Sequence, residues 1–420
     1  MRRKTLITAL CILVLVALVL LPTFGLTGML GLTQSGPLYH EENIYATYEF
    51  NTLKTPTGLL GLNVNVATGG STYATRFRLY IADSGNHLIR YFDTHSGTLY
   101  NVAGISATSG YVNGAVSSSK FNMPTGLWGE NMAYATVNGC DHWTQIPGGH
   151  GQYCDQPHID RYNAQKIYVN DSQNFVMRRI CAGDSVAATG DCVGQVGQVI
   201  TSCGSNLEGY VDGPNASAKF ETLTGVMKRS NGTYYMVDAG NHVIRSWNET
   251  NVYTYAGDGT VGLVNGYRTG AKFAAPTKMV EDTSGKLIIS DMNNHAIRVI
   301  DTGGYVTTLA GSGQPGYANG SGSQALFNRP TSIVFNSADG MTYVADSHNN
   351  CIRRIDSSGN VTTYAGSNEA GRVDGSLTQA RFDGPVDLVI NGGYMYVSDS
   401  RNNCIRRIDM VNGQVSTYIS

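Results

Sequence analysis

The chain has 420 residues, with 29 Lys and Arg against 31 Asp and Glu, so its formal net charge is −2. Without the basic residues at positions 2–4 the balance is 26 to 31, and a chain with no basic excess is not expected to bind nucleic acid. A charged fraction of only 14%, with 51 Gly and 25 Tyr, is typical of an extracellular β protein.

The N-terminus predicts export from the cytoplasm. Three basic residues at 2–4 precede an uncharged apolar run over 6–21, and small residues follow around Gly25. This order is typical of a secretory signal peptide, residues 1–25. Because further apolar residues follow, an uncleaved membrane anchor through residues 5–30 stays open as the alternative. Either way, the remainder is expected to be secreted, or anchored outside the cytoplasm.

Residues 26–49 are predicted to be a spacer. The strand-like segment 43–49 within it has no assigned partner. It could instead cover the open edge of a sheet, since an uncovered edge invites pairing with another chain.

One sequence frame recurs six times in the rest of the chain: apolar-Tyr-apolar-x-Asp-x-x-Asn-x-x-Ile-Arg. The copies start at Leu79, Ile167, Tyr234, Leu287, Thr342 and Met395. Their aspartates are 88, 67, 53, 55 and 53 residues apart, so the basic unit has 53 to 55 residues and the second unit carries insertions. A repeat of this period determines the architecture before any single residue is interpreted.

Each unit contains four short apolar runs, which in the fifth unit cover 330–335, 342–346, 351–356 and 361–366. The runs are rich in β-branched and aromatic residues and are bounded by Gly, Asn, Asp or Ser, so each is expected to be a strand. Six four-stranded antiparallel units predict an all-β fold, a six-bladed β-propeller over residues 50–420. The alternatives are a β-helix, whose repeats are shorter, and an open array, whose end repeats would need polar caps.

The units resemble the NHL-repeat family. The resemblance rests on Tyr-Val-Ala-Asp-Ser-x-Asn-Asn-Cys-Ile-Arg-Arg-Ile-Asp, which starts at Tyr343 in the fifth unit, preceded by Phe-x-x-Pro and followed by Ala-Gly. It covers roughly residues 50–420 and implies an NHL-like propeller. Fold alone does not determine function.

The repeated polar residues have a structural interpretation. Asp at the end of the second strand and Asn three residues later suit a tight turn, and Arg can bridge neighbouring blades as a bidentate donor. The residues are Asp83, Asn86 and Arg90; Asp171, Asn174 and Arg178; Asp238, Asn241 and Arg245; Asp291, Asn294 and Arg298; Asp346, Asn349 and Arg353; and Asp399, Asn402 and Arg406.

The ring is expected to close without a shared strand. Phe50–Pro56 leads into the first blade much as Phe121–Pro124 leads into the second, and Val415–Ile419 repeats the fourth strand of the preceding unit. The sixth blade is therefore complete, and closure depends on packing between the first and last blades.

Five cysteines lie in the second unit, which has inserts at 131–165 and 182–197 on one face. In an oxidising compartment they favour the disulfides Cys140–Cys154 and Cys181–Cys192, with Cys203 unpaired, although other pairings stay open. A zinc site is the alternative, and its candidate ligands are Cys140, His142, His150, Cys154 and His158. Cys351 and Cys404 occupy equivalent positions too far apart to pair, and are expected to be buried core residues.

Three histidines follow the repeated Asn: His87, His242 and His295. They invite comparison with zinc-dependent lyases that are related to the NHL group. Here they fall at turns away from the axis of the ring, so they are interpreted as turn residues. Their counterparts in the other units are Phe175, Asn350 and Asn403.

The first strands should line the central channel, and the acidic residues considered there as inward ligands are Asp387 and the pair Glu281 and Asp282. A metal-dependent propeller enzyme needs several inward ligands. No catalytic residue, metal or cofactor is therefore predicted. The less favoured alternative remains an extracellular metal-dependent hydrolase or lyase with its site at the channel.

The segment between the fourth strand of one unit and the first strand of the next, called here the return, carries Asn-Gly or Asp-Gly and then Phe. The Phe is expected to anchor neighbouring blades; the five are Phe121, Phe220, Phe273, Phe327 and Phe382. The returns form a loop-rich face suited to a protein or glycan partner. The predicted function is a secreted or tethered binding or scaffold module, with self-assembly as an option and the oligomeric state open.

Glycosylation sequons are permitted in an exported protein. The candidate sites are Asn215, Asn231, Asn248, Asn319 and Asn360, and a sixth sequon begins at Asn170.

Overall fold

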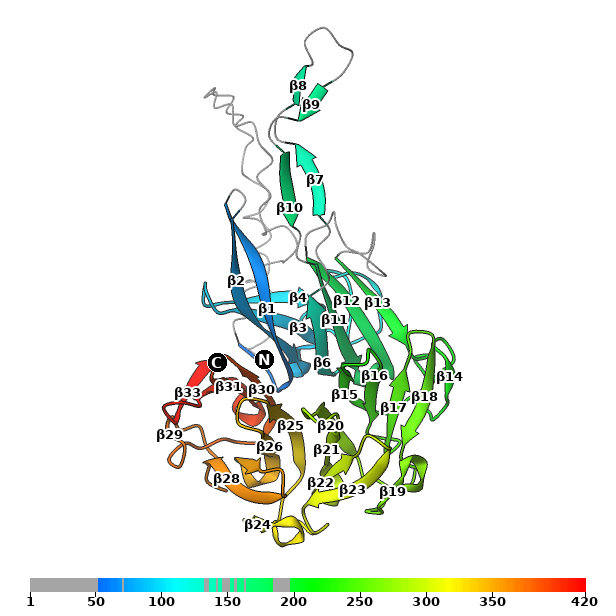
Figure 1. Ribbon diagram of the computed structural model, residues 1–420, viewed down its shortest axis with the longest axis vertical. Coiled ribbons are helices and arrows are strands. Elements are labelled where there is room, and N and C mark those ends of the chain that lie inside the picture. The colour runs from blue at the N-terminus through cyan, green and yellow to red at the C-terminus, as the bar shows by residue number, and fades with distance from the viewer. Residues whose placement is uncertain are drawn as a thin grey trace, which may run out of the picture. The chain divides into compact units, whose positions relative to one another are not determined.

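The computed structural model describes residues 52–69, 72–131, 136–140, 143–145, 152–154, 157–161, 164–183 and 197–420 (Figure 1). Side chains are described for 52–64, 74–130, 166–181 and 197–420. The predicted signal or anchor (1–25) and the predicted spacer (26–49) lie outside these residues. No helix in the described part has the length and hydropathy that a membrane span requires.

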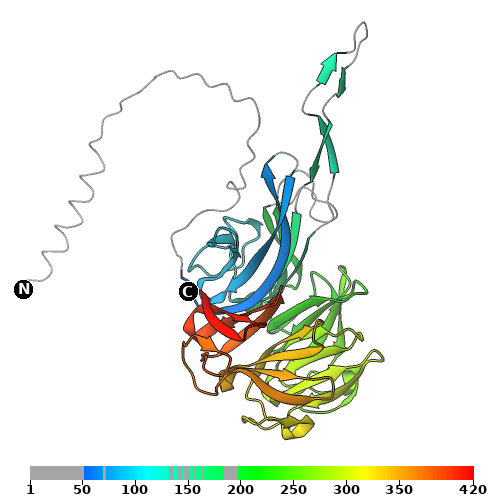
Figure 2. The same ribbon diagram turned by 60° about the vertical axis from the view of Figure 1, so that its left-hand side comes forward.

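Six antiparallel sheets form a closed ring, which confirms the six-bladed propeller (Figures 1 and 2). Within each blade the four main strands pair in chain order. Blade 1 contains β1 (Pro56–Gly69), β2 (Thr72–Asp83), β3 (Leu88–Asp93) and β4 (Thr98–Ala103); blade 2 contains β6 (Pro124–Asn131), β11 (Ala164–Asp171), β12 (Val176–Gly183) and β13 (Gln198–Cys203); blade 3 contains β15 (Leu223–Lys228), β16 (Tyr234–Asp238), β17 (Val243–Trp247) and β18 (Asn251–Ala256).

The other three blades repeat this order. Blade 4 contains β20 (Pro276–Glu281), β21 (Leu287–Asp291), β22 (Ala296–Ile300) and β23 (Tyr305–Ala310); blade 5 contains β25 (Pro330–Asn336), β26 (Met341–Asp346), β27 (Cys351–Ile355) and β28 (Asn360–Gly366); blade 6 contains β30 (Pro385–Asn391), β31 (Tyr394–Asp399), β32 (Cys404–Asp409) and β33 (Gln414–Ile419). The first strands contact one another around the axis, and β1 contacts both β6 and β30.

Blades 2 to 6 have a fifth strand, which the sequence pattern did not predict. Each is a two-residue piece of the return that pairs with the outermost strand of the blade that follows it. They are β5 (Gly114–Ala115), β14 (Gly213–Pro214), β19 (Gly266–Tyr267), β24 (Gly320–Ser321) and β29 (Gly375–Ser376). Two residues are too short to show an apolar pattern, but they cover part of the outer sheet edge, which would otherwise expose backbone donors and acceptors.

The phenylalanine of each return lies between two blades, as predicted. Phe121 is buried in one cluster with Ile89 of blade 1 and Ile180 and Val199 of blade 2. Each blade packs against a neighbour on both of its faces. This explains why consecutive residues of the middle strands are buried.

Blade 6 is complete without an N-terminal strand, because all five strands of its sheet come from residues 375–419. At the junction with blade 1, Leu53 and Leu59 pack against Ile405 and Ile419. Leu53 precedes Pro56 by the same three residues that separate Phe121 from Pro124, so Leu53 takes the place of the phenylalanine anchor. Phe50, which begins the segment that leads into the first blade, lies outside the described residues.

Blade 2 carries the predicted insert between its first two strands. Here β7 (Thr136–Cys140) pairs with β10 (Pro157–Arg161), and β8 (Trp143–Gln145) pairs with β9 (Gln152–Cys154). The hairpin of β1 and β2 is also long, with strands of 14 and 12 residues, and Figure 2 shows it in blue extending past the other strands of its sheet.

Candidate functional site

The repeated Asp, Asn and Arg form one buried cluster per blade, called here the node. In blade 4, Asp291 ends β21 and a 3-10 turn, η6 (Met292–Asn294), brings Asn294 back toward it. Asn294 Nδ2 donates to Asp291 Oδ2 at 2.8 Å, and Arg298 Nη1 donates to the same oxygen at 3.0 Å. The other carboxylate oxygen accepts the backbone N–H of Ala274 at 2.8 Å. The same bonds recur in the other five blades.

The node arginine binds the return that precedes its own blade, which corrects the prediction that it bridges neighbouring blades. Arg298 donates to the carbonyls of Lys272 and Val264, each at 2.9 Å, and to Asn265 Oδ1 at 3.0 Å. Its guanidinium carbon lies 5.2 Å from the centroid of the Phe273 ring. The Asn-Gly and Asp-Gly pairs therefore supply an acceptor for the arginine besides forming a turn, a role that their spacing did not reveal.

Burial dominates the electrostatics of the node. Both Asp291 and Arg298 have side chains that are 0% exposed. Desolvation raises the pKa of Asp291 to about 6, although Asn294, the Ala274 amide and Arg298 all favour its charged form. A buried ion pair of this kind adds little net stability, but removing one partner leaves an uncompensated charge. The six nodes thus specify the blade geometry and the path of the return.

The three turn histidines connect neighbouring blades. His295 adopts the left-handed conformation at the end of η6, and its Nδ1 accepts the backbone N–H of Arg329 in blade 5 at 3.1 Å. His87 and His242 accept in the same way from Met123 and Ala275, at 3.3 and 3.1 Å. They lie at separate blade junctions, as predicted, and are not brought together.

Asparagine replaces histidine at two further junctions. Asn350 Oδ1 accepts the backbone N–H of Gly384 at 3.0 Å, and Asn403 Oδ1 accepts that of Thr55 at 2.8 Å. The second of these hydrogen bonds joins blade 6 to blade 1. Phe175 occupies the position in blade 2, where its side chain offers no acceptor.

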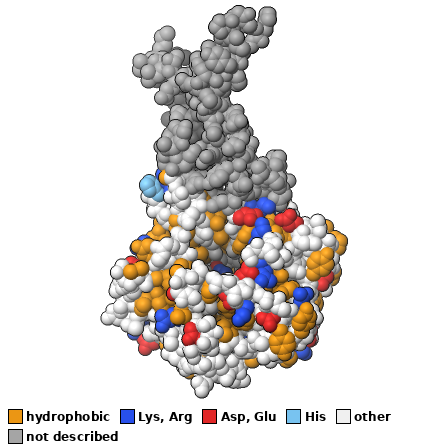
Figure 3. Space-filling view, viewed as in Figure 1, with side chains coloured by type: hydrophobic (Ala, Val, Ile, Leu, Met, Phe, Trp, Pro, Cys, Tyr) orange, Lys and Arg blue, Asp and Glu red, His pale blue; other side chains and the backbone are white. Residues whose placement is uncertain are grey.

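The central channel is lined mainly by threonine, glycine and aliphatic residues of the first strands. A cavity of about 130 Å³ lies there, and Figure 3 shows a hollow at the centre of the ring. Several threonines share hydrogen bonds with serines of the second strand or its turn, as Thr125 Oγ1 does with Ser172 Oγ at 2.5 Å. These hydroxyls are therefore largely occupied by contacts within the ring.

Asp387 is the buried acid of the channel, and its carboxylate is already engaged. It accepts Ser332 Oγ at 2.6 Å and the backbone N–H of Leu59 at 2.7 Å, and it pairs with Lys278 Nζ. The carboxylate therefore joins blades 1, 4, 5 and 6 in an electrically neutral contact.

The other two acidic candidates do not line the channel. Glu281 accepts Arg229 Nε at 2.8 Å, and Asp282 accepts backbone N–H groups in its own turn. Among the residues described, no group of three or more His, Cys, Asp or Glu is arranged to hold a metal ion.

Three cysteines are buried free thiols, Cys203, Cys351 and Cys404, in agreement with prediction. Cys181 is buried in β12 and disulfide-bonded. The side chains of the other cysteines and histidines in the predicted disulfides and zinc site (Cys140, His142, His150, Cys154, His158 and Cys192) lie outside those described, so the pairing of Cys181 with Cys192 stays a prediction.

The return face exposes apolar side chains that the core does not use. Leu207 and Val261 are 59% and 64% exposed, and Tyr210, Val211 and Val264 are exposed as well. The hydroxyl of Tyr210 shares a 3.0 Å hydrogen bond with Thr254, and its ring packs beside Gly259 in the next return. These five residues, from the returns before blades 3 and 4, are called the return patch below.

The sequons differ in exposure. Asn231, Asn248, Asn319 and Asn360 are exposed. Asn215 is partly buried, and its amide is bound to Trp247 and to the Glu249 carbonyl. Asn170 is fully buried in β11.

No protein-family model matches the sequence. The chain is 26% identical over 373 residues to human NHL repeat-containing protein 2, in an alignment that covers 81% of this chain and 46% of that protein. It is 25% identical over 364 residues to Protein SUPPRESSOR OF QUENCHING 1, chloroplastic, from Arabidopsis thaliana. That alignment covers 82% of this chain and 30% of the Arabidopsis protein. The chain thus spans less than half the length of these relatives.

Among solved structures, virginiamycin B lyase from Staphylococcus aureus aligns with a TM-score of 0.44 at 14% identity, over 87% of this chain and 85% of that one. This resemblance carries no inference about activity.

Proposed function

We propose, from the premise that the chain is an NHL-repeat β-propeller, that it serves outside the cytoplasm, secreted or tethered, as a binding module for a protein partner. The observation that carries the proposal is the return patch. The repeated nodes hold the returns rigidly, so that the exposed side chains of Leu207, Tyr210 and Val261 form a preorganised surface.

The chemistry of the return patch favours a protein partner. Aliphatic residues grouped around a tyrosine match the apolar centre of protein interfaces, where aromatic side chains are enriched and charged ones depleted. Tyr210 also stacks on the node arginine, since the Arg245 guanidinium carbon lies 5.2 Å from its ring centroid. A ring fixed in this way loses little conformational entropy on binding.

Two alternatives are less well supported. A glycan partner would use planar polar groups around an aromatic face, whereas Leu207, Val211, Val261 and Val264 are aliphatic. A hydrolase or lyase at the channel has no supporting observation among the described residues, because the acid present there, Asp387, is paired.

The test uses a photo-crosslinking amino acid placed at Val261 in protein exported by its own cells. The matched control places it at Tyr305, which is 48% exposed at the start of β23 and belongs to neither the return patch nor the cavity described below. The proposal predicts one discrete protein adduct from position 261 that is weak or absent from position 305. An adduct of twice the chain mass would assign the patch to self-assembly. Equal labelling from both positions, or no protein adduct together with selective glycan binding, would contradict the proposal.

A further inference from the structure

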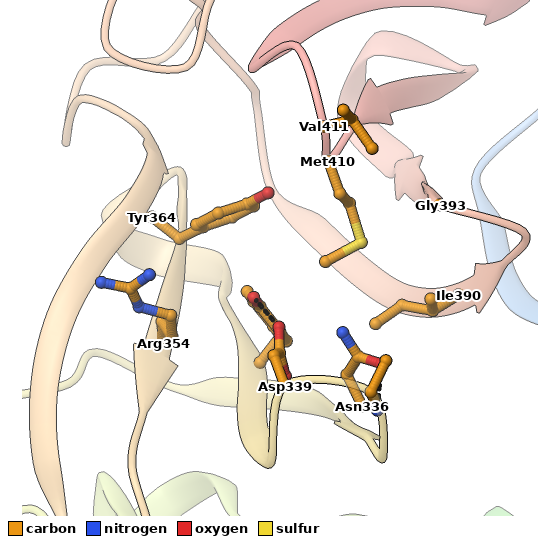
Figure 4. A pocket seen from close by; sticks show the side chains of 10 residues that line it. Asn336, Asp339, Arg354, Tyr364, Ile390, Gly393, Met410 and Val411 are labelled. Atoms are coloured by element: carbon orange, nitrogen blue, oxygen red, sulfur yellow. Dashed lines mark hydrogen bonds between the residues drawn. The ribbon is translucent and has the colours of Figure 1, made fainter.

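A second cavity lies between blades 5 and 6, on the face opposite the returns. It has a volume of about 310 Å³, which is at the lower end of the range for small-ligand sites. Its walls are the turns β25–β26, β30–β31 and β32–β33, and they contribute Asn336, Asp339, Ile390, Met410 and Val411 (Figure 4). This cavity is called the seam pocket below.

Two other blade junctions carry an ion pair at the strand positions that border this cavity. Between blades 3 and 4, Arg229 Nε donates to Glu281 Oε1 at 2.8 Å. At the same two strand positions between blades 2 and 3, Glu130 pairs with Lys228 at 3.0 Å. These ion pairs link the two blades of their junction.

The corresponding residues between blades 5 and 6 are Asn336 and Ile390, six and five residues after the first residue of β25 and β30. Asn336 is shorter than arginine, and the side chain of Ile390 carries no charge. The seam pocket therefore lies at a junction that lacks the ion pair found between blades 2 and 3 and between blades 3 and 4.

The aromatic wall of the junction is nevertheless retained. The Tyr343 and Tyr364 rings meet edge to face with centroids 4.8 Å apart, as Tyr235 and Tyr255 do at 4.7 Å between blades 3 and 4. In that junction the Arg229 guanidinium carbon lies 5.9 Å from the Tyr235 centroid. An arginine side chain thus occupies the equivalent space against an equivalent tyrosine pair within this same protein.

The seam pocket also contains an available carboxylate. Asp339 Oδ2 accepts the Tyr343 hydroxyl at 2.8 Å and Oδ1 accepts the Met341 N–H at 2.9 Å, but among the described residues Asp339 makes no ion pair. In Figure 4 the Arg354 guanidinium points away from Asp339. The Asn336 amide faces the space between Asp339 and Met410. Burial raises the pKa of Tyr364 above its ordinary value.

We propose that the seam pocket binds the guanidinium of an arginine side chain presented by a partner polypeptide. The guanidinium stacks on Tyr364 and donates to Asp339, and its alkyl arm packs along Ile390 and Met410. Guanidinium combines a planar face for aromatic stacking with a fork of donors for a carboxylate, which is the pairing that this wall offers. The site lies on the opposite face from the return patch and does not depend on it.

The binding test is a titration of the full chain with acetyl-Gly-Arg-Gly-amide. Peptides with citrulline or lysine in place of arginine are the matched probes, because citrulline keeps the shape without the charge and lysine keeps the charge without the plane. We expect the arginine peptide to bind about tenfold more tightly than either, from a charge-assisted bidentate contact. Equal binding of all three peptides would overturn the proposal. Tighter binding of free arginine than of the peptide would contradict the claim that the arginine belongs to a partner polypeptide.

Variants connect the binding to the pocket. Asp339→Asn should weaken the arginine peptide about tenfold by removing the charged acceptor. Asp301→Asn, an exposed turn aspartate of blade 4, should not change its affinity. Arg354→Gln should strengthen binding, because it removes a like charge from the wall. Unchanged affinity in Asp339→Asn would contradict the assignment.

A filled variant makes the test independent of any loss of stability. Asn336→Arg combined with Ile390→Glu recreates the ion pair that Arg229 and Glu281 form two blades earlier. It should abolish peptide binding while the melting temperature is kept or raised. A folded double variant that still binds the arginine peptide with native affinity would place the peptide elsewhere and overturn the proposal.

Discussion

The backbone N–H of Thr55 donates to Asn403 Oδ1 across 2.8 Å, and this hydrogen bond joins the first blade to the last. It is the same contact that His242 makes with Ala275 between blades 3 and 4. Since blade 6 contains no N-terminal strand, closure of the ring depends on this contact, on the Asp387 network and on the apolar packing around Leu59.

Asn403→Gly should therefore lower the free energy of unfolding by about 1 kcal/mol, the usual net contribution of one hydrogen bond. Glycine keeps the left-handed backbone at this position, where φ is 51°, and removes only the acceptor. Asn403→His should recover most of the loss, since histidine makes this bond at other junctions. Urea unfolding measures both variants, and equal stability of Asn403→Gly and the native chain would show that the contact contributes nothing.

The histidine junctions predict a pH dependence. Burial, reinforced by the charge of Arg329, lowers the pKa of His295 below its ordinary value of 6.5. The folded protein thus binds fewer protons there than the unfolded chain, so the stability from this group is present above about pH 6.5 and is lost as pH falls through the folded pKa.

His295→Asn keeps an acceptor that does not titrate, as Asn350 shows in the next blade. Between pH 7.5 and 5.5 the variant should lose less stability than the native chain in urea unfolding. Groups that both proteins share, including the buried aspartates, cancel in this comparison. A larger loss in the variant would contradict the assigned role of Nδ1.

The node predicts that two adjacent arginines differ greatly in their contribution to the stability of the fold. Arg353 is fully buried and donates to Asp346, to two backbone carbonyls and to Asn319, whereas Arg354 is exposed. Arg353→Met should destabilise the fold by about 3–5 kcal/mol, because it leaves the Asp346 carboxylate buried and unpaired. Arg354→Met should change stability by no more than about 0.5 kcal/mol. Similar melting temperatures for the two variants would contradict the structural role of the node.

The free thiols should be inert in the folded state. Burial raises the pKa of Cys203 and of Cys404 to about 12 and raises that of Cys351 as well. Thiolate is the reactive form, so alkylation at pH 8 should modify these three only after unfolding. Peptide mass mapping of native and denatured protein distinguishes them from the other cysteines. Rapid modification of Cys351 in the native chain would mean that blade 5 opens locally.

The six-bladed framework of the molecule could be predicted from sequence, because the same sequence frame recurs in all six blades. The Asp and Asn positions gave the second strands and their turns, and the Phe of each return gave the blade junctions. The fifth strands could not be predicted, since two residues carry no periodicity. The hydrogen bond between Arg298 and Asn265 was not predicted either, because Asn265 lies far from Arg298 in sequence and resembles an ordinary turn residue.

The features that differ between blades were the hardest to find. Asp387 was recognised as an inward acid, but its ion pair with Lys278 depends on how β20 and β30, from two blades that are not adjacent, lie around the channel. The seam pocket arises from two ordinary residues, Asn336 and Ile390, which become informative only when their junction is compared with the one that contains Arg229 and Glu281.

The most direct test of the binding role is the affinity of the protein captured from position 261. Its Kd should be measured by calorimetry against the native chain and against the variant Leu207→Ser with Val261→Ser. Removing two exposed apolar contacts from the centre of an interface should weaken binding at least about tenfold, with an unchanged melting temperature. An unchanged Kd in the folded double variant would contradict the assignment of the return patch as the binding surface.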